Sequence, residues 1–294
     1  MRILVSHRQN SIFKEFVDLY IIRNNYTYQN VKIYQIKTMI NYIRRHIPTK
    51  YKVFIHNKLI CKINNYKLFR SKINYKKIPI IINNYNRLYF LQKLIYSLEL
   101  RGYNNIYIID NNSTYPPLLE YYNNKCLYPI FKLKENIGYD AIWKTEIFDK
   151  FKHNFYVYTD SDMQIDDACP DNFLVHFLSI MQKHPLCEKV GFGIRIDNIP
   201  DYYIHKEKVI KHETHFWEKE VHKNVFRASI DTTFAVYRPY CGGPANLNKE
   251  TYRTGAPYLI KHLPWYLDYA HLDKEEEYYI NSITQSTHWS KMHK

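Results

Sequence analysis

Two carboxylates stand one residue apart in Asp160-Ser161-Asp162 and could together bind a cation. The segment before them, 155–159, is aromatic and β-branched, which favours a buried strand. Ligands of open α/β sheets bind in the crevice outside the carboxyl ends of the strands, where these carboxylates would lie. Hard oxygen donors suit Mg²⁺ or Mn²⁺, which commonly bridge to phosphate. The alternative is an Asx turn, in which aspartate bonds locally to the backbone.

Three earlier apolar segments also end in polar residues, and helical patterns separate them. The apolar segments are short and continuous, as expected of buried parallel strands. The predicted strands span 78–82, 105–109, 128–133 and 155–159. The predicted helices cover 88–98, a segment opening at Pro116-Pro117, and 141–151. This alternation predicts an α/β, Rossmann-like fold, a mostly parallel sheet flanked by helices with a site along one edge.

Glycine-rich phosphate loops are absent from the sequence. No G-x-G-x-x-G follows the first predicted strand, and no G-x-x-x-x-G-K-[ST] occurs anywhere. The dinucleotide fingerprint and the P-loop are therefore both missing. A phosphate bound at this edge would have to be held by a metal ion and by side chains.

The polar residues at the four strand ends form an ordered series. They are Tyr85-Asn86-Arg87, Asp110-Asn111-Asn112-Ser113, Asn136-x-Gly138 and Asp160-x-Asp162. This series resembles the nucleotide-sugar-binding half of GT-A glycosyltransferases and is close to the inverting glycosyltransferase family 2. Those enzymes usually carry a proline two residues before the tyrosine of the first motif, and this chain lacks it. The resemblance covers residues 78 to about 165.

The resemblance implies a role for each matched residue. Tyr85 and Asp110 would contact the nucleobase and ribose. Asp160 would face the ribose or the metal, and Asp162 would bind the metal that bridges the diphosphate. The remaining residues expected to bind the nucleotide sugar are Arg87, Asn136 and Gly138.

The resemblance also implies an activity: transfer of a sugar from a nucleotide-diphosphate sugar to an acceptor hydroxyl, with inversion. Mn²⁺ or Mg²⁺ would neutralise the charge on the leaving diphosphate as a Lewis acid. A UDP-sugar is the favoured donor, and the acceptor would be a glycan, a lipid-linked molecule or a protein.

Beyond residue 165 the candidates rest on weaker patterns. A predicted strand at 190–197 holds two glycines, which suggests close approach of backbone or ligand. Asp197 at its end would face the acceptor or donor sugar, unless it only forms a turn. Residues 201–224 are histidine-rich, but their H-E-T-H is one residue short of the zinc-binding H-E-x-x-H. We expect a solvated loop or helix there, with Trp217 near the sugars.

Three more residues complete the candidate site. In similar inverting enzymes the general base follows the D-x-D strand, and this resemblance makes Asp231, in a predicted strand at 228–237, the candidate base. The alternative is a buried or strand-edge aspartate without a catalytic role. Arg253 could hold a phosphate through its fork of donors. GT-A enzymes often return a C-terminal histidine to the metal or diphosphate, and the resemblance gives that role to His262, whose imidazole suits Mn²⁺; the alternative is a histidine with a structural role only. From Asp273 on, we expect a charged helix and a polar tail without chemistry.

The positive charge of the chain is unevenly placed. The net charge is +14, and residues 1–77 hold 17 Lys and Arg against Glu15 and Asp18, which gives +15. This asymmetry predicts a small basic N-terminal unit at 1–77, with an amphipathic helix over 31–47 and a hairpin over 53–63. The unit could meet an anionic membrane surface or present a solvated face; nucleic acid is not the expected partner. Residues 78–294 would form the GT-A domain, divided into a nucleotide-sugar-binding half (78–165) and an acceptor-binding half (166–294).

Cysteine usage and hydropathy bear on the compartment. Five cysteines are scattered without a C-x-x-C pair, which argues against a zinc module or a disulfide framework and is typical of a reducing compartment. No apolar run approaches the roughly 18 to 20 residues of a membrane span, and residues 1–10 lack a signal-peptide core. We expect a cytoplasmic protein, peripheral to a membrane if the basic unit binds one.

Two other classes of function compete with sugar transfer. A nucleotidyltransferase would make a nucleotide sugar from a sugar phosphate, but the glycine- and lysine-rich loop that such enzymes usually carry after the first strand is missing. A non-catalytic module that binds polyanions would need neither aspartate of the D-x-D pair.

Overall fold

The computed structural model describes residues 73–243 and 250–283. The chain divides into two compact units, 1–63 and 64–294, and the described residues belong to the second. The helix and hairpin predicted within 1–77 lie outside the described residues, so the membrane-binding role of that unit stays a prediction. Within the described ranges, no helix combines the length and the apolar character that crossing a membrane requires.

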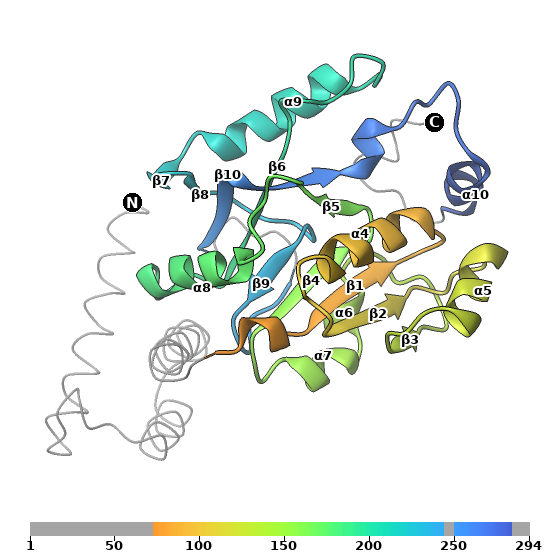
Figure 1. Cartoon of the computed structure of the whole chain (residues 1–294), viewed down its shortest axis with the longest axis horizontal. Coiled ribbons are helices and arrows are strands. Elements are labelled where there is room, and N and C mark those ends of the chain that lie inside the picture. Colours follow the sequence, from red (N-terminus) through yellow and green to blue (C-terminus); the bar gives the residue numbers. More distant parts are fainter. Residues whose placement is uncertain (1–72, 244–249, 284–294) are drawn as a thin grey trace, which may run out of the picture. The chain divides into compact units, whose positions relative to one another are not determined.

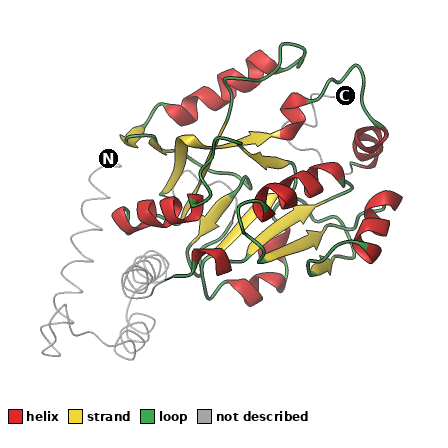
Figure 2. Ribbon diagram, in the orientation of Figure 1, coloured by secondary structure: helices red, strands yellow, loops and turns green. Residues whose placement is uncertain are grey.

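The described strands form one mixed sheet (Figures 1 and 2). Its order is β3-β2-β1-β4-β9-β6-β10-β8-β7, with β5 paired to β10. The strands are β1 (Ile80–Asn84), β2 (Ile106–Asp110), β3 (Ile130–Lys132), β4 (Tyr156–Asp160), β5 (Met163–Ile165), β6 (Lys189–Ile194), β7 (Glu220–His222), β8 (Val225–Arg227), β9 (Ala235–Tyr237) and β10 (Thr251–His262).

Most of these strands run in one direction. β1 pairs in parallel with β2 and β4, β2 pairs in parallel with β3, and β6 with β10. β9 is antiparallel to both β4 and β6, so β6 and β10 point the same way as β4. The carboxyl ends of β1, β2 and β4 therefore meet at one edge of the sheet, as predicted.

Helices cover both faces of the sheet. They are α4 (Tyr89–Glu99), α5 (Pro116–Asn124), α6 (Ala141–Lys144), α7 (Ile147–Phe151), α8 (Phe173–Lys183), α9 (Lys206–Thr214) and α10 (Lys274–Ser282). Successive side chains of a strand point to opposite faces, so Ile80 and Ile82 join one core with α4, α5 and α8, while Ile81 joins the other with α6 and α7. The predicted fold class, a mostly parallel α/β sheet flanked by helices, is confirmed.

Two predicted elements differ from the structure. The helix predicted over 141–151 is broken at Thr145, which is extended and whose hydroxyl donates to the Ala141 carbonyl, a local bond that competes with helix. Of the strand predicted over 228–237, only β9 (Ala235–Tyr237) forms, and residues 228–234 are a loop between β8 and β9. The backbone carbonyls of this loop accept hydrogen bonds from two strands. The Ser229 carbonyl accepts from the side chain of Arg253 in β10, and the Thr232 carbonyl accepts from the backbone amide of Asp160 in β4.

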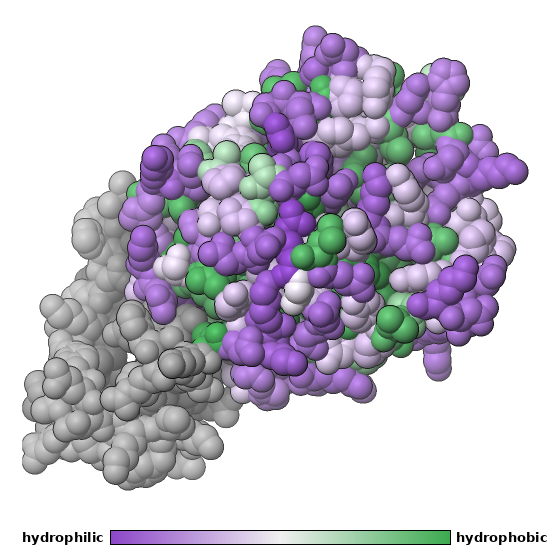
Figure 3. All heavy atoms as spheres, viewed as in Figure 1, coloured by the Kyte–Doolittle hydropathy of each residue, from purple (hydrophilic) through white to green (hydrophobic). Residues whose placement is uncertain are grey.

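The surface of the described part is mostly hydrophilic. The face in Figure 3 carries hydrophilic side chains with small hydrophobic areas between them. The most exposed large apolar side chains include Leu127 and Ile204, which are 89% and 66% exposed and come from different loops. Scattered apolar side chains of this kind are normal on a globular protein.

Candidate functional site

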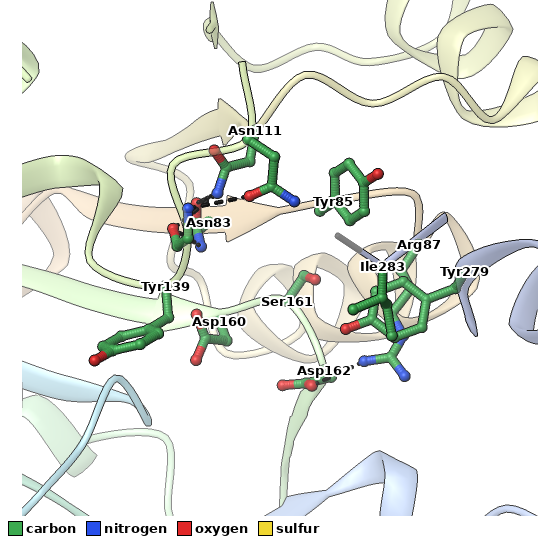
Figure 4. A pocket seen from close by; sticks show the side chains of 12 residues that line it. Asn83, Tyr85, Arg87, Asn111, Tyr139, Asp160, Ser161, Asp162, Tyr279 and Ile283 are labelled. Carbon is green, nitrogen blue, oxygen red and sulfur yellow. Dashed lines mark hydrogen bonds and ion pairs between the residues drawn. The ribbon is translucent and has the colours of Figure 1, made fainter. Parts of the chain in front are cut away.

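A pocket of about 160 Å³ lies at the carboxyl ends of β1, β2 and β4 (Figure 4). Polar side chains and one helix that is distant in sequence form its walls. The lining residues are Asn83, Tyr85, Arg87, Asn111, Asn136, Gly138, Tyr139, Asp160, Ser161, Asp162, Tyr279 and Ile283. Seven residues of the strand-end series are among them, so the structure brings most of that series together.

Asp160 ends β4 and is held by its neighbours on both sides. It lies in register with Asn83 of β1. Its amide donates to the Thr232 carbonyl over 3.1 Å, and the Thr232 hydroxyl donates to its carboxylate. Burial, followed by the charge of Asp162, raises the pKa of Asp160 well above its ordinary value. A cation bound beside Asp160 and Asp162 would stabilise the charged form of both carboxylates.

Asp162 faces two positively charged or chargeable groups. Its Oδ2 accepts from Nη1 of Arg87 at 3.0 Å and lies 3.5 Å from Nε2 of His262. Burial alone would raise the pKa of Asp162, but His262 and Arg87 lower it below its ordinary value. His262 arrives there because β10 pairs with β5 and places His262 opposite Met163, the residue after Asp162.

Tyr85, Asn136 and Gly138 lie in the pocket wall. The Tyr85 hydroxyl donates to the Ser282 carbonyl at 2.8 Å, which leaves its ring against the pocket. Gly138 has a φ of +93°, which glycine adopts readily. Its carbonyl accepts from Asn111 at 2.8 Å, and its amide donates to Asn136 at 3.0 Å. The Asn-x-Gly motif thus shapes the loop.

Asp110 lies beneath the site, outside the pocket lining. It is only 3% exposed, and its carboxylate accepts from the Ser113 amide. Burial raises the pKa of Asp110, although the bonds from Ser113 oppose the rise. In this structure Asp110 fixes the turn after β2 and does not reach the cavity.

Asp231 lies close to the pocket although it is not part of its lining. It is exposed, and its neighbour Thr232 bonds Asp160. Its carbonyl accepts from Nζ of the buried Lys189 at 3.3 Å, which anchors the loop between β8 and β9 from behind. The structure therefore brings an exposed carboxylate next to the paired aspartates.

Arg253, Asp197 and Trp217 have partners of their own away from the pocket lining. Arg253 is 3% exposed and donates to Glu213 at 2.7 Å. Asp197 pairs with Arg195 at 2.7 Å. The ring of Trp217 packs so close to Gly193 that a Cβ there would lie 2.5 Å from it. The close approach predicted at the glycines of β6 is thus made by protein atoms.

Helix α10 supplies pocket residues that the sequence interpretation missed. Glu276 pairs with Arg87, while Tyr279 and Ile283 line the pocket. Figure 4 shows Arg87, Tyr279 and Ile283 together on one side. Glu276 and Tyr279 are three residues apart and share one face of α10, with Ile283 just beyond its end; this spacing was the available signal.

The side chains at this edge of the sheet could hold a divalent cation only if a bound substrate supplied further ligands to the metal. Among the described residues, no group of three or more His, Cys, Asp or Glu side chains is arranged to hold a metal ion. Asp162 and His262 converge, Asp160 lies beside them, and Nδ1 of His262 is buried without a protein partner. Carboxylate oxygen and imidazole nitrogen suit Mn²⁺, and Mg²⁺ usually takes substrate phosphates as further ligands.

Comparison with known proteins gives only distant similarities. No family description matches this chain, and no curated protein does. Among solved structures, GalNAc-T7 with UDP, GalNAc and Mn²⁺ is similar over 65% of this chain and 44% of that one, at 11% identity and a TM-score of 0.43. S. aureus TarS 1-349 is similar over 63% of this chain and 60% of that one, at 14% identity and a TM-score of 0.39. This chain spans less than two thirds of the length of both structures.

Proposed function

We propose that this protein is a glycosyltransferase that binds a nucleotide-diphosphate sugar in the strand-end pocket and transfers the sugar to an acceptor hydroxyl. One observation carries the proposal: Asp162, which lines a polar pocket together with Asp160, meets His262 from a hundred residues later in the chain. Such an edge is where open α/β sheets bind ligands. The ordered strand-end motifs, which resemble those of family 2, support the same function.

Asp162 and His262 would hold Mn²⁺ or Mg²⁺ together with the donor diphosphate, with Asp160 serving the metal or the ribose. A divalent cation bound there neutralises charge on the leaving nucleoside diphosphate, which is worth several kcal/mol in a transition state. The rings of Tyr85 and Tyr139 and the loop at Gly138 would enclose the rest of the donor. A UDP-sugar remains the favoured donor.

Asp231 would act as general base in a single displacement with inversion. The acceptor oxygen would bond to the anomeric carbon, the bond from that carbon to the phosphate oxygen would break, and the acceptor proton would pass to Asp231. Support comes from its exposure and from Thr232, which bonds Asp160. A base placed in this way contributes about 10²–10⁴-fold to the rate.

The test is a screen of sugar nucleotides for transfer or hydrolysis by the full chain, with Mn²⁺ and with chelator. We expect release of nucleoside diphosphate that depends on the metal. A nucleotidyltransferase would instead release pyrophosphate from a nucleoside triphosphate and a sugar phosphate. Metal-independent release, or no release from any sugar nucleotide, would contradict the proposal.

A further inference from the structure

The C-terminal helix α10 docks against the carboxyl end of β1 through buried ionic contacts. Glu276 is 3% exposed, and its two carboxylate oxygens accept from Nε and Nη2 of Arg87 at 3.0 and 2.8 Å. A bidentate pair between arginine and carboxylate fixes both groups in position as well as in charge. In Figure 1, α10 lies at the edge toward which β1 and β2 point.

Arg87 transmits this contact to the candidate metal ligand. Its third nitrogen, Nη1, donates to Asp162 at 3.0 Å. The guanidinium is thus shared between a carboxylate of α10 and a carboxylate of the D-x-D pair, and it is only 7% exposed. Loss of the Glu276 charge would leave a buried arginine with only Asp162 as a counter-ion, so both Arg87 and Asp162 would lose their fixed positions.

Tyr279 adds a wall to the pocket from the same helix face. Its ring lies 3.6 Å from the guanidinium carbon of Arg87 and forms an edge contact with the ring of Tyr85 at 6.3 Å between centroids. Ile283, just beyond the helix, lines the pocket beside it. The position of α10 therefore determines the shape of the cavity on the side of Arg87 (Figure 4).

The first strand-end motif directs its polar groups toward α10. The Tyr85 hydroxyl donates to the Ser282 carbonyl, and the side-chain amide of Asn86 donates through Nδ2 to the Ser282 hydroxyl, both at 2.8 Å. These contacts join residues nearly two hundred positions apart. The docking of α10 thus adds two hydrogen bonds to a motif whose Asn86 is also bonded to Ser113, Thr114 and Tyr115.

We propose that α10 is a built part of the donor site, in which Glu276 is a positioning residue for Arg87 and Asp162 and Tyr279 forms a wall that contacts the bound nucleoside diphosphate. This inference rests on the proposed function. It assigns binding to a helix whose sequence, Lys-Glu-Glu-Glu-Tyr-Tyr, has the composition of an ordinary solvated surface.

The sequence of α10 offers matched pairs of variants for the test. Glu276→Gln removes the buried charge, whereas Glu277→Gln changes an exposed glutamate one position later. Tyr279→Ala removes the pocket wall, whereas Tyr278→Ala changes a neighbour that bonds Thr114 and packs on Tyr115 outside the pocket. All four are compared with the wild-type full chain.

Calorimetric titration of UDP and of GDP in the presence of Mn²⁺ gives the dissociation constants, at a temperature where circular dichroism shows each variant folded. We expect binding about tenfold weaker in Glu276→Gln and in Tyr279→Ala. Binding in Glu277→Gln and Tyr278→Ala should stay within about twofold of wild type. If α10 had only a structural role, the substitutions would lower the melting temperature and leave the dissociation constants unchanged.

The outcomes separate this inference from the proposed function. Wild-type binding together with undiminished binding in both Glu276→Gln and Tyr279→Ala would overturn the role of α10 and leave the glycosyltransferase proposal intact. If neither UDP nor GDP bound the wild type in the presence of Mn²⁺, the role of α10 and the glycosyltransferase proposal would both be overturned. Should Glu276→Gln fail to fold, Tyr279→Ala against Tyr278→Ala decides the question alone.

Discussion

The two halves of the described chain build the pocket in different ways. In 78–165, consecutive β-α units bring Tyr85, Asn136 and Asp160 to one edge, because parallel strands joined by helices end at the same side of the sheet. In 166–283, antiparallel pairing and long-range docking deliver His262 and α10 to that edge, and leave other candidates elsewhere. Local sequence order therefore predicts the first set, whereas the second depends on tertiary structure.

Two ionic groups, one half-buried and one buried, differ in what surrounds them. Asp162, from the first half, faces the pocket and meets Arg87 and His262. Arg253, from the second half, is enclosed by Glu213, the Ser229 carbonyl and the ring of Phe216. We infer that Asp162 serves ligand binding and Arg253 serves stability.

The largest effect is expected from Asp162→Asn. Loss of this carboxylate should reduce kcat/KM for sugar transfer about 1,000-fold, or about 4 kcal/mol, because the metal loses its main oxygen ligand. Steady-state kinetics with Mn²⁺ measures the loss. Asp149→Asn, on the exposed side of α7, is the matched control and should retain activity.

Arg253→Met should affect stability and spare the site. Glu213 would keep a buried charge without its partner, which costs about 3 kcal/mol. Denaturant titration would show the loss as a lower unfolding midpoint, while the affinity of the folded variant for UDP and Mn²⁺ should match wild type. Weaker nucleotide binding with an unchanged unfolding midpoint would show that Arg253 belongs to the donor site and would contradict its assignment to stability.

Asp231→Asn should slow transfer about 100-fold, or about 2.7 kcal/mol, through kcat. Binding of UDP should change less than about twofold, since Asp231 would act on the acceptor proton and not on the donor. Asp197→Asn provides the contrast, because Asp197 is 69% exposed on its side chain and pairs with Arg195. Equal losses in the two variants would remove Asp231 as the base.

The smallest effect concerns the docking of α10 as pH changes. Burial, together with the charges of Glu276 and Asp273, raises the pKa of Glu275 to about 7, while bonds from the Tyr89 and Leu88 amides oppose the rise. The folded state then binds more protons than the unfolded state between pH 4.5 and 7. Stability from this group is therefore present at low pH and is lost as pH rises through that window.

Deprotonation of Glu275 should lower the free energy of unfolding of the wild type by about 1 kcal/mol between pH 5 and 8. This value is reduced for screening by solvent. Glu275→Gln should remove that part of the pH dependence and keep an acceptor for the Tyr89 amide. The measurement is denaturant unfolding of both proteins across the range. Identical profiles would show that Glu275 is solvated.

The limits of prediction from sequence follow from the same comparison. β1, β2 and β4 and their polar ends were predicted because short apolar runs and helical periodicity are local signals. The helix from 274 was predicted too, but not its role, because three consecutive glutamates look alike in sequence. Only the docking of α10 buries Glu275 and Glu276 and leaves Glu277 exposed.

Arg253 shows the opposite case, in which the sequence predicts a binding role and the structure places the side chain away from the pocket. A phosphate-binding role was predicted from the chemistry of its side chain, yet its position in β10 directs it to Glu213 of α9. No local pattern distinguishes an arginine that binds a ligand from one that pairs within the core. Asp110 is similar, since its motif was recognised but the turn it caps lies below the cavity.

We propose that the paired aspartates and His262 form a metal-dependent site for a nucleoside diphosphate. Its most direct test is calorimetric titration of UDP into the wild type and Asp162→Asn, each with and without Mn²⁺. We expect UDP to bind the wild type with Mn²⁺ and to bind at least about tenfold more weakly in the other three cases. Equal affinity in all four titrations would contradict this proposal.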